Sequence, residues 1–185
     1  MRFCDANTVL KPMSNRTIVI AVDDSPVSKD AVRWATRKLL TPQDEVHLVS
    51  VLDRGGRSTV MTAGENTYPL DRDPGECKPD PVQLEKRFEL LKSLKQNILQ
   101  DSKVQKVSMS TMVSCVGGSS DLGRHICDYA ADKKADMLVM GSRGMGSAQK
   151  AVLGLFGLGS VSDFVVRHAS VSNVLVHRGG VSGKE

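Results

Sequence analysis

Aromatic residues and long apolar runs are both scarce in this sequence, and each scarcity excludes a class of protein. Aromatic side chains make up 4% of the 185 residues, and 25 Lys and Arg against 21 Asp and Glu leave a formal net charge of only +4. Nucleic-acid-binding proteins usually carry a concentrated basic stripe and, for RNA, exposed aromatic side chains. No run approaches the ~20 apolar residues that a helix needs to cross a bilayer. We therefore expect no nucleic-acid partner and no membrane partner.

The sequence also shows little sign of cysteine motifs or of the pattern of a secretory signal. The four cysteines form no CxxC pair and the four histidines show no metal-ligand spacing, so we expect neither a disulfide framework nor a metal site. The opening residues 1–13 lack the apolar core of a secretory signal, and the predicted location is the cytoplasm. The glycine motifs of P-loop proteins, dinucleotide-binding proteins and α/β-hydrolases are absent as well.

The sequence does contain a regular alternation of short β-branched runs and amphipathic segments. The runs predict five strands, over residues 17–22, 46–51, 107–115, 136–140 and 173–177. Helical periodicity predicts four helices, over residues 26–39, 84–98, 119–130 and 161–169. Strands separated by helices require crossover connections, which build a parallel sheet. We therefore predict an α/β fold of three layers, in which helices cover both faces of an open parallel five-stranded sheet.

The same pattern predicts one domain with mobile ends. Residues 1–15 are polar and unpatterned, and residues 178–185 form a Gly-rich tail, so we expect both to be flexible. The domain then spans residues 16–177. Within it, residues 53–80 are rich in Gly and Pro and far exceed the usual ~4–6 residues of a connection, which predicts a long loop or an insertion.

Ligands of open parallel sheets bind beyond the carboxyl ends of the strands, where this sequence places an acid and several glycines. Asp23 follows the first strand, and Gly141 and Gly144 follow the fourth. Glycines and a helix N-terminus together favour a phosphate. The glycines could equally serve only to shape a turn, and Asp23 could cap the next helix. Arg143 could bind phosphate or remain solvated.

The last predicted helix has an N-terminal signature of its own. Ser160 precedes Asp163 by three residues, which is the spacing of a capping box with Asp in place of Glu. This pattern predicts that the Ser160 hydroxyl satisfies N–H groups of the helix. Such a capping role is compatible with contact to a phosphate.

Taken together, the segments IVIAVDDS, AVRWA, DMLVMGSRGMG, GSVSDFVVRHA and NVLVH resemble the universal stress protein family over residues 16–177. The resemblance implies a Rossmann-like fold of the adenine-nucleotide alpha hydrolase type. It also implies the nucleotide-binding branch of that family, which carries G-x2-G-x9-G-(S/T). The residues that the resemblance assigns to an adenine nucleotide are Asp23 for the ribose, Ala21, Val22 and Val51 for the adenine, Met140, Gly141, Arg143, Gly144, Gly154 and Gly159 for the glycine loop, and Ser160, Val161 and Ser162 for the phosphates.

The chain departs from the family pattern at one point. Gly154, nine residues after Gly144, is followed by Leu155 rather than Ser or Thr, and the expected Gly-Ser pair arrives as Gly159-Ser160. We therefore interpret residues 155–159 as a five-residue insertion. It either bulges outward or displaces the phosphate cradle, and we favour the bulge because loop-closure cost grows slowly with length.

The expected function is binding of ATP or AMP, with or without Mg²⁺, as a stress-response or signalling module that binds a protein partner not identified by the sequence. No general base, nucleophile or carboxylate pair accompanies the glycines, so any ATP hydrolysis should be slow. A nucleotide-free dimeric interaction module is the alternative. The resemblance also implies homodimers through residues 173–177, whose Val-rich edge invites pairing with another copy.

Overall fold

The structure is a computed structural model that describes residues 15–53, 80–142 and 159–179. The predicted alternation of strands and helices is confirmed. In chain order the elements are β1 (Thr17–Ala21), α1 (Pro26–Lys38), β2 (Glu45–Asp53), α2 (Pro81–Asp101), β3 (Lys106–Ser114), α3 (Ser119–Asp132), β4 (Met137–Gly141), α4 (Ser160–His168) and β5 (Asn173–His177). The loop predicted over residues 53–80, apart from its two ends, and most of both predicted flexible termini lie outside the described residues.

All five strands run parallel in the order β3-β2-β1-β4-β5. The central strand β1 pairs on both sides, with Ala21 opposite Val49 of β2 and opposite Met140 of β4. The chain first builds outward from β1 through β2 to β3, and then returns to place β4 on the other side of β1. The strand order therefore reverses between β1 and β4, and the crevice expected at such a reversal lies at their carboxyl ends.

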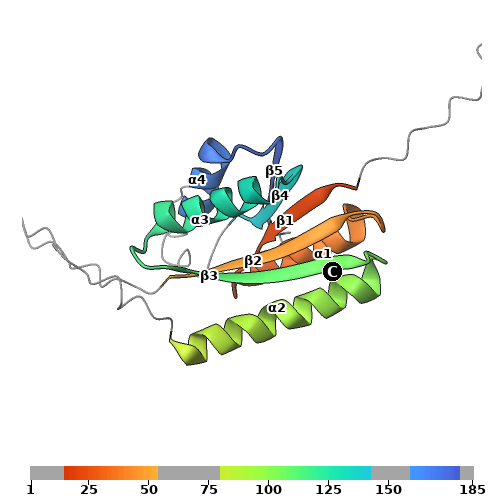
Figure 1. Cartoon of the computed structure of the whole chain (residues 1–185), viewed down its shortest axis with the longest axis horizontal. Helices are drawn as coiled ribbons and strands as arrows, with labels where there is room; N and C mark the ends of the chain where they lie inside the picture. The colour runs from red at the N-terminus through yellow and green to blue at the C-terminus, as the bar shows by residue number, and fades with distance from the viewer. Residues whose placement is uncertain (1–14, 54–79, 143–158, 180–185) are drawn as a thin grey trace, which may run out of the picture.

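Two apolar cores, one on each face of the sheet, account for the continuous apolar run of β1. Ile18 and Ile20 face the core made with α1 and α2. Val19 and Ala21 face the core made with α3 and α4, and Figure 1 shows the two helix layers on opposite sides of the strands. Burial of each large aliphatic side chain contributes roughly 1.5–3 kcal/mol. A strand enclosed on both faces must be apolar throughout, so β1 shows no alternation.

The starts of α1 and α4 differ, and one sequence prediction fails at α4. Ser25 caps α1, because its hydroxyl oxygen accepts a hydrogen bond of 3.1 Å from Ser28 N. At α4 the N-cap is Gly159, with no side-chain cap. The predicted capping box at Ser160 is therefore wrong: Ser160 already lies inside the helix, one position too late for a cap.

Two further observations concern cysteines and membranes. Cys115 is disulfide-bonded, which corrects the expectation of a chain without disulfides; a search for CxxC spacing cannot detect a pair that only folding brings together. Cys127 is a buried free thiol on α3. None of the described helices is long and apolar enough to cross a membrane.

Candidate functional site

The segment after β1 forms a tight turn around the carboxylate of Asp23. Asp23 Oδ1 accepts hydrogen bonds from Ser25 N at 3.0 Å and from Ser25 Oγ at 2.6 Å. Asp23 N donates to Ser28 Oγ at 3.0 Å. The predicted turn-capping role of Asp23 is therefore present in the structure. The two bonds from Ser25 both use the same carboxylate oxygen, Oδ1. The arrangement fixes the side chain at the carboxyl end of β1.

Two hydrogen bonds from β2 hold the backbone that leads into this turn. Val22 N donates to Val49 O at 2.8 Å, and the buried Ser50 hydroxyl donates to Val22 O at 2.6 Å. Both polar groups of Val22 are thus satisfied in the core, where an unpaired carbonyl would cost about 1–3 kcal/mol. Ser50 was not identified from the sequence, because a serine inside a strand carries no signal of its partner.

Gly141, at the end of β4, is required by the close approach of α1. A Cβ atom on Gly141 would lie 3.1 Å from Ser28 N and 3.2 Å from the carbonyl carbon of Val27. Backbone atoms cannot move aside as a side chain can, so this position favours glycine on packing grounds alone. Close packing against α1 therefore accounts for a glycine at this position, independently of any turn or ligand.

The two ends of the glycine loop are joined directly. Gly159 N donates to Ser142 O at 2.6 Å, and Ser162 Oγ lies within hydrogen-bond distance of both Ser142 O, at 3.2 Å, and Gly159 O, at 2.9 Å. These bonds place the N-terminus of α4 beside the carboxyl end of β4. Because the loop ends meet at Ser142 and Gly159, the start of α4 keeps its position however the intervening residues run.

The predicted site residues fall into three groups. Ala21, Val22 and Met140 are buried at the ends of β1 and β4, whereas Val51 is half-buried in β2. At the start of α4, Ser160 is exposed, Val161 is half-buried, and Ser162 is buried with its hydroxyl engaged by the loop ends. The remaining predicted residues, Arg143, Gly144 and Gly154, lie outside the described part of the chain. The fold therefore brings the first two groups to one edge of the sheet.

A histidine at the end of β5 connects this edge to α1. His177 O accepts a hydrogen bond from Ser142 N at 2.8 Å, and His177 Nε2 donates to Asp30 Oδ2 at 2.9 Å. The hydrogen bond from His177 is the main cause that lowers the pKa of the Asp30 carboxyl below its ordinary value. The His177 ring also lies 5.6 Å from the Trp34 ring. These contacts support the backbone of Ser142 from outside the crevice.

Charge at the carboxyl edge is mostly negative among the described residues. Asp23 and Asp24 follow β1, Asp53 ends β2, and Asp121 lies in the first turn of α3. The guanidinium of Arg87 on α2 approaches this group from behind, with Nη1 3.5 Å from Asp24 Oδ2. The described residues include no cluster of three or more His, Cys, Asp or Glu side chains that could hold a metal ion.

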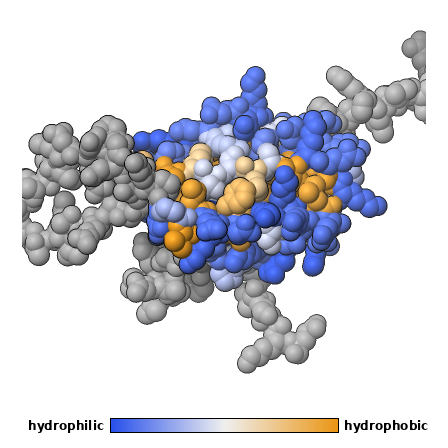
Figure 2. All heavy atoms as spheres, turned by 60° about the horizontal axis from the view of Figure 1, so that its bottom comes forward, coloured by the Kyte–Doolittle hydropathy of each residue, from blue (hydrophilic) through white to orange (hydrophobic). Residues whose placement is uncertain are grey.

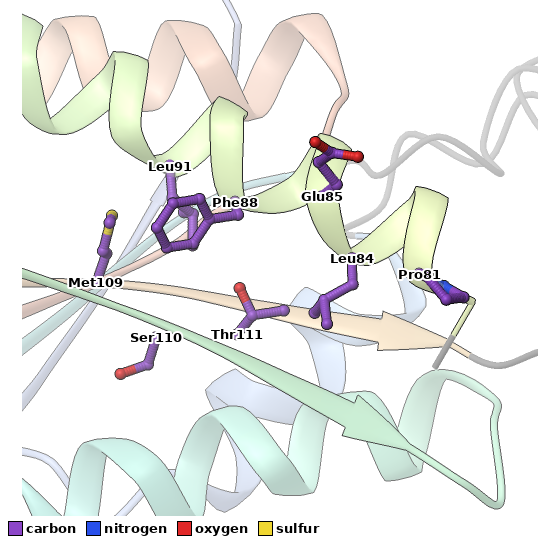
Figure 3. Close-up of a pocket in the computed structure, with 8 residues that line it drawn as sticks. All are labelled: Pro81, Leu84, Glu85, Phe88, Leu91, Met109, Ser110 and Thr111. Atoms are coloured by element: carbon purple, nitrogen blue, oxygen red, sulfur yellow. The ribbon is translucent and has the colours of Figure 1, made fainter. Parts of the chain in front are cut away.

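An apolar groove lies away from this edge, between α2 and β3. It has a volume of about 430 Å³, and its lining residues are Pro81, Leu84, Glu85, Phe88, Leu91, Met109, Ser110 and Thr111. Figure 3 shows Leu84 and Phe88 projecting from α2 toward the β3 residues. In Figure 2, apolar surface on the forward face lies in separate patches among hydrophilic residues. The ionisable side chain of the groove is the acid Glu85, and its other polar side chains are the hydroxyls of Ser110 and Thr111, so the groove is a poorer candidate for an anionic ligand than the strand reversal.

The comparisons with known proteins agree with this architecture. The profile of the universal stress protein family matches residues 14–177. Universal stress protein PHOS32 of Arabidopsis thaliana is 29% identical over 164 residues, which cover 88% of this chain and 65% of that protein. The chain thus spans about two thirds of the length of that relative.

Similar solved structures share the fold at lower sequence identity. A universal stress protein in complex with cAMP has a TM-score of 0.56 at 17% identity, covering 90% of this chain and 99% of that one. The universal stress protein from Archaeoglobus fulgidus in complex with dAMP has a TM-score of 0.55 at 19% identity, covering 89% and 99%. The family match over residues 14–177 and the shared sheet lead to one conclusion: this chain belongs to the universal stress protein family.

Proposed function

We propose that this protein binds an adenine nucleotide, ATP or AMP, at the carboxyl ends of β1 and β4. The observation that carries the proposal is the strand order β3-β2-β1-β4-β5, which reverses where the Asp23 turn, Gly141 and the start of α4 meet. Structures of universal stress proteins in complex with cAMP and with dAMP support an adenine nucleotide as the ligand.

Each part of the nucleotide has a candidate partner of matching chemistry. The Asp23 carboxylate would accept a hydrogen bond from a ribose hydroxyl, since its two present bonds both use Oδ1. The apolar Val22 and Val51 side chains would flank the adenine. The exposed Ser160 and the N–H groups of the first turn of α4, which has no side-chain cap, would face the phosphates, because a helix N-terminus favours an anion.

Binding rather than turnover is the proposed activity. Phosphoryl transfer relies on bound metal and on positioned charge, and the described residues provide no metal-binding cluster. Where Mg²⁺ accompanies ATP, the phosphates would supply most of its ligands. Binding would then act through the conformation of the carboxyl edge and through the partner that reads it.

Calorimetric titration of nucleotide-stripped protein with ATP, AMP and GTP, each with and without Mg²⁺, tests the proposal. Ser160→Ala removes an exposed hydroxyl at the start of α4, and Ser170→Ala removes an exposed hydroxyl just beyond the end of the same helix. We expect ATP binding that is weakened about tenfold or more by Ser160→Ala and unchanged by Ser170→Ala, since one hydrogen bond to a charged group contributes about 1.5–3 kcal/mol.

Two variants are needed to test the ribose contact of Asp23, because its carboxylate also accepts the hydrogen bonds that close the turn. Asp23→Asn keeps a side-chain oxygen for Ser25, whereas Asp23→Ala removes it. Loss of affinity in Asp23→Ala alone, accompanied by a lower unfolding temperature, would point to the turn rather than to the ribose. Absence of binding by the wild-type protein to all three nucleotides would refute the proposal, and the alternative of a nucleotide-free interaction module would replace it.

A homodimer through β5 is a second part of the proposal. β5 lies at an edge of the sheet, and four of its five residues, Val174 to His177, are only partly buried. An edge strand of this kind offers unpaired backbone groups to a second copy. Sedimentation at tens of micromolar should give a dimer, and a 20.0 kDa monomer would contradict it. The cytoplasmic location stays a prediction.

A further inference from the structure

Arg87 on α2 is a largely buried cation, and two of its three guanidinium nitrogens lack a hydrogen-bond partner among the described residues. Its side chain is 11% exposed, and its Nε and Nη1 atoms are buried without a hydrogen-bond partner in the described part of the chain. Its ion pair with Asp24 has an N–O distance of 3.5 Å, which is too long for a good charge-assisted hydrogen bond. Burying polar N–H groups in this way is costly, and such a group calls for an explanation.

Stabilisation of the fold does not explain this arrangement well. A guanidinium that forms two short parallel bonds to a carboxylate can offset its desolvation, but Arg87 forms no such pair with Asp24. Asp24 is 40% exposed, so water could solvate its carboxylate without help from Arg87. An uncharged side chain of similar length at position 87 would fill the same space without the desolvation cost.

The location of Arg87 suggests an electrostatic role instead. Asp24 is adjacent to Asp23, and Asp53 and Asp121 lie at the same edge of the sheet. A nucleotide phosphate that approaches this edge meets carboxylates of its own sign. The cations of Lys29 and Arg178 are half-exposed and exposed, so solvent screens them, whereas the charge of a buried Arg87 is screened much less.

We propose that Arg87 is a specificity-determining residue of the nucleotide site, which offsets the charge of Asp24 and so favours ligands with more phosphate groups. This inference rests on the proposed function and goes beyond it, because it ranks ATP above AMP and AMP above uncharged adenosine. Arg87 would act on the ligand through its charge, from its position beside Asp24, and needs no direct contact with the nucleotide. The contribution therefore grows with the negative charge of the ligand.

The test compares three ligands and four proteins without Mg²⁺, so that the ligand charges differ fully. ATP, AMP and adenosine are titrated into the wild-type protein, Arg87→Met, Arg87→Lys and the control Arg37→Met, at low and at high salt. Arg37 is an exposed residue in the last turn of α1, at the opposite end of that helix from Asp24, and its substitution changes the net charge by the same amount. Thermal unfolding of each protein is followed in parallel.

In Arg87→Met we expect ATP affinity to fall about tenfold, AMP affinity to fall less and adenosine affinity to stay unchanged, as charge interactions at short range in a protein predict. Arg87→Lys should restore most of the ATP affinity, Arg37→Met should leave all three affinities unchanged, and high salt should reduce the difference between wild type and Arg87→Met. The unfolding temperature of Arg87→Met should be equal to or above that of the wild type.

An additional substitution separates charge from shape. Asp24→Asn in the Arg87→Met background removes the charge that Arg87 offsets, so ATP affinity should return toward the wild-type value. An equal loss for ATP and adenosine in Arg87→Met, or an unchanged ratio of ATP to AMP affinity, would overturn the charge-selecting role while leaving nucleotide binding intact. A wild-type protein that binds none of the three ligands would overturn both proposals.

Discussion

The amino and carboxyl edges of the same sheet are built in different ways. At the amino edge, the connections from α1 to β2 and from α3 to β4 are short. Hydrogen bonds to the side chains of Asp44 and Asp136 hold these two connections. At the carboxyl edge, the connections after β2 and β4 span residues 54–80 and 142–159. Long loops on a rigid scaffold are where α/β proteins carry binding residues. With the proposed nucleotide site at the carboxyl edge, this comparison predicts that stability and ligand binding depend on opposite edges of the sheet.

Arg16 and Asp44 are the centre of the amino edge. Arg16 donates to Asp44 Oδ1 at 2.8 Å and to Asp44 Oδ2 at 2.7 Å, and Thr41 N donates to Oδ2 at 2.7 Å. Burial, the largest single effect, raises the pKa of Asp44, but the bonds from Arg16 and Thr41 outweigh it and lower the pKa overall. At the same edge, Thr17 N donates a hydrogen bond to Asp136 Oδ2 at 2.8 Å. The carboxylates of this edge are thus satisfied by the protein itself.

The largest expected effect is the loss of stability on Asp44→Ala. The Asp44 side chain is 2% exposed, and its removal leaves the Arg16 guanidinium and Thr41 N without their acceptor, so the free energy of unfolding should fall by about 3 kcal/mol. Urea denaturation measures this change, with Asp132→Ala at the exposed end of α3 as the control. Nucleotide affinity of the folded variant should not change. A fall in affinity without a fall in stability would contradict the division between the edges.

Gly141→Ala should affect both properties, because this glycine lies where β4 meets α1. The added Cβ atom would contact the Ser28 backbone at 3.1 Å and push α1 away, at a cost of about 1–3 kcal/mol. Gly179→Ala is the matched control, because its Cβ atom would meet only a side chain, Val27, at 3.4 Å. Chemical denaturation and nucleotide titration should both report a loss for Gly141→Ala. If stability stays at the wild-type value, the packing explanation of Gly141 is wrong.

Ser25→Ala should lower stability by about 1 kcal/mol, which is the usual cost of losing a helix N-cap. The Ser25 hydroxyl accepts a bond from Ser28 N, whereas Ser160 does not cap α4. Ser160→Ala is therefore the control for stability and should leave the unfolding midpoint unchanged. Equal losses in the two variants would mean that α1 and α4 start in the same way, against the structure.

The smallest expected effect is a pH dependence that arises at His47. Burial lowers the pKa of His47 below its ordinary value, so the unfolded chain takes up the proton first as the pH falls. The stability gained from the neutral ring is complete above the unfolded pKa of about 6.5 and is lost as the pH falls through the lower folded pKa. His47→Gln should flatten the pH dependence of the unfolding free energy below about pH 6.5. A slope identical to that of the wild type would assign the effect to another group.

Local sequence was sufficient wherever neighbouring residues decide the structure. The strand at residues 173–177 and the start of α1 at Pro26 were predicted as observed, because side-chain pattern and proline placement act within a few residues. The position of Asp23 beyond β1 was predicted on the same ground. Partners far apart in the chain were not found: Ser50 with Val22, or Arg87 with Asp24. The start of α4 was misplaced by one residue, since Gly159 and Ser160 both satisfy local rules for an N-cap.

The sequence by itself determined the alternation of strands and helices and the buried character of β1. It also determined that an acid follows β1 and that glycines follow β4. These properties follow from periodicity and backbone preference, which are local. Only the tertiary structure decided that α1 packs against Gly141, that the loop ends meet at Ser142 and Gly159, and that Arg87 is buried behind Asp24. The physical reason is that close contacts and buried charge depend on which distant segments the parallel sheet places side by side.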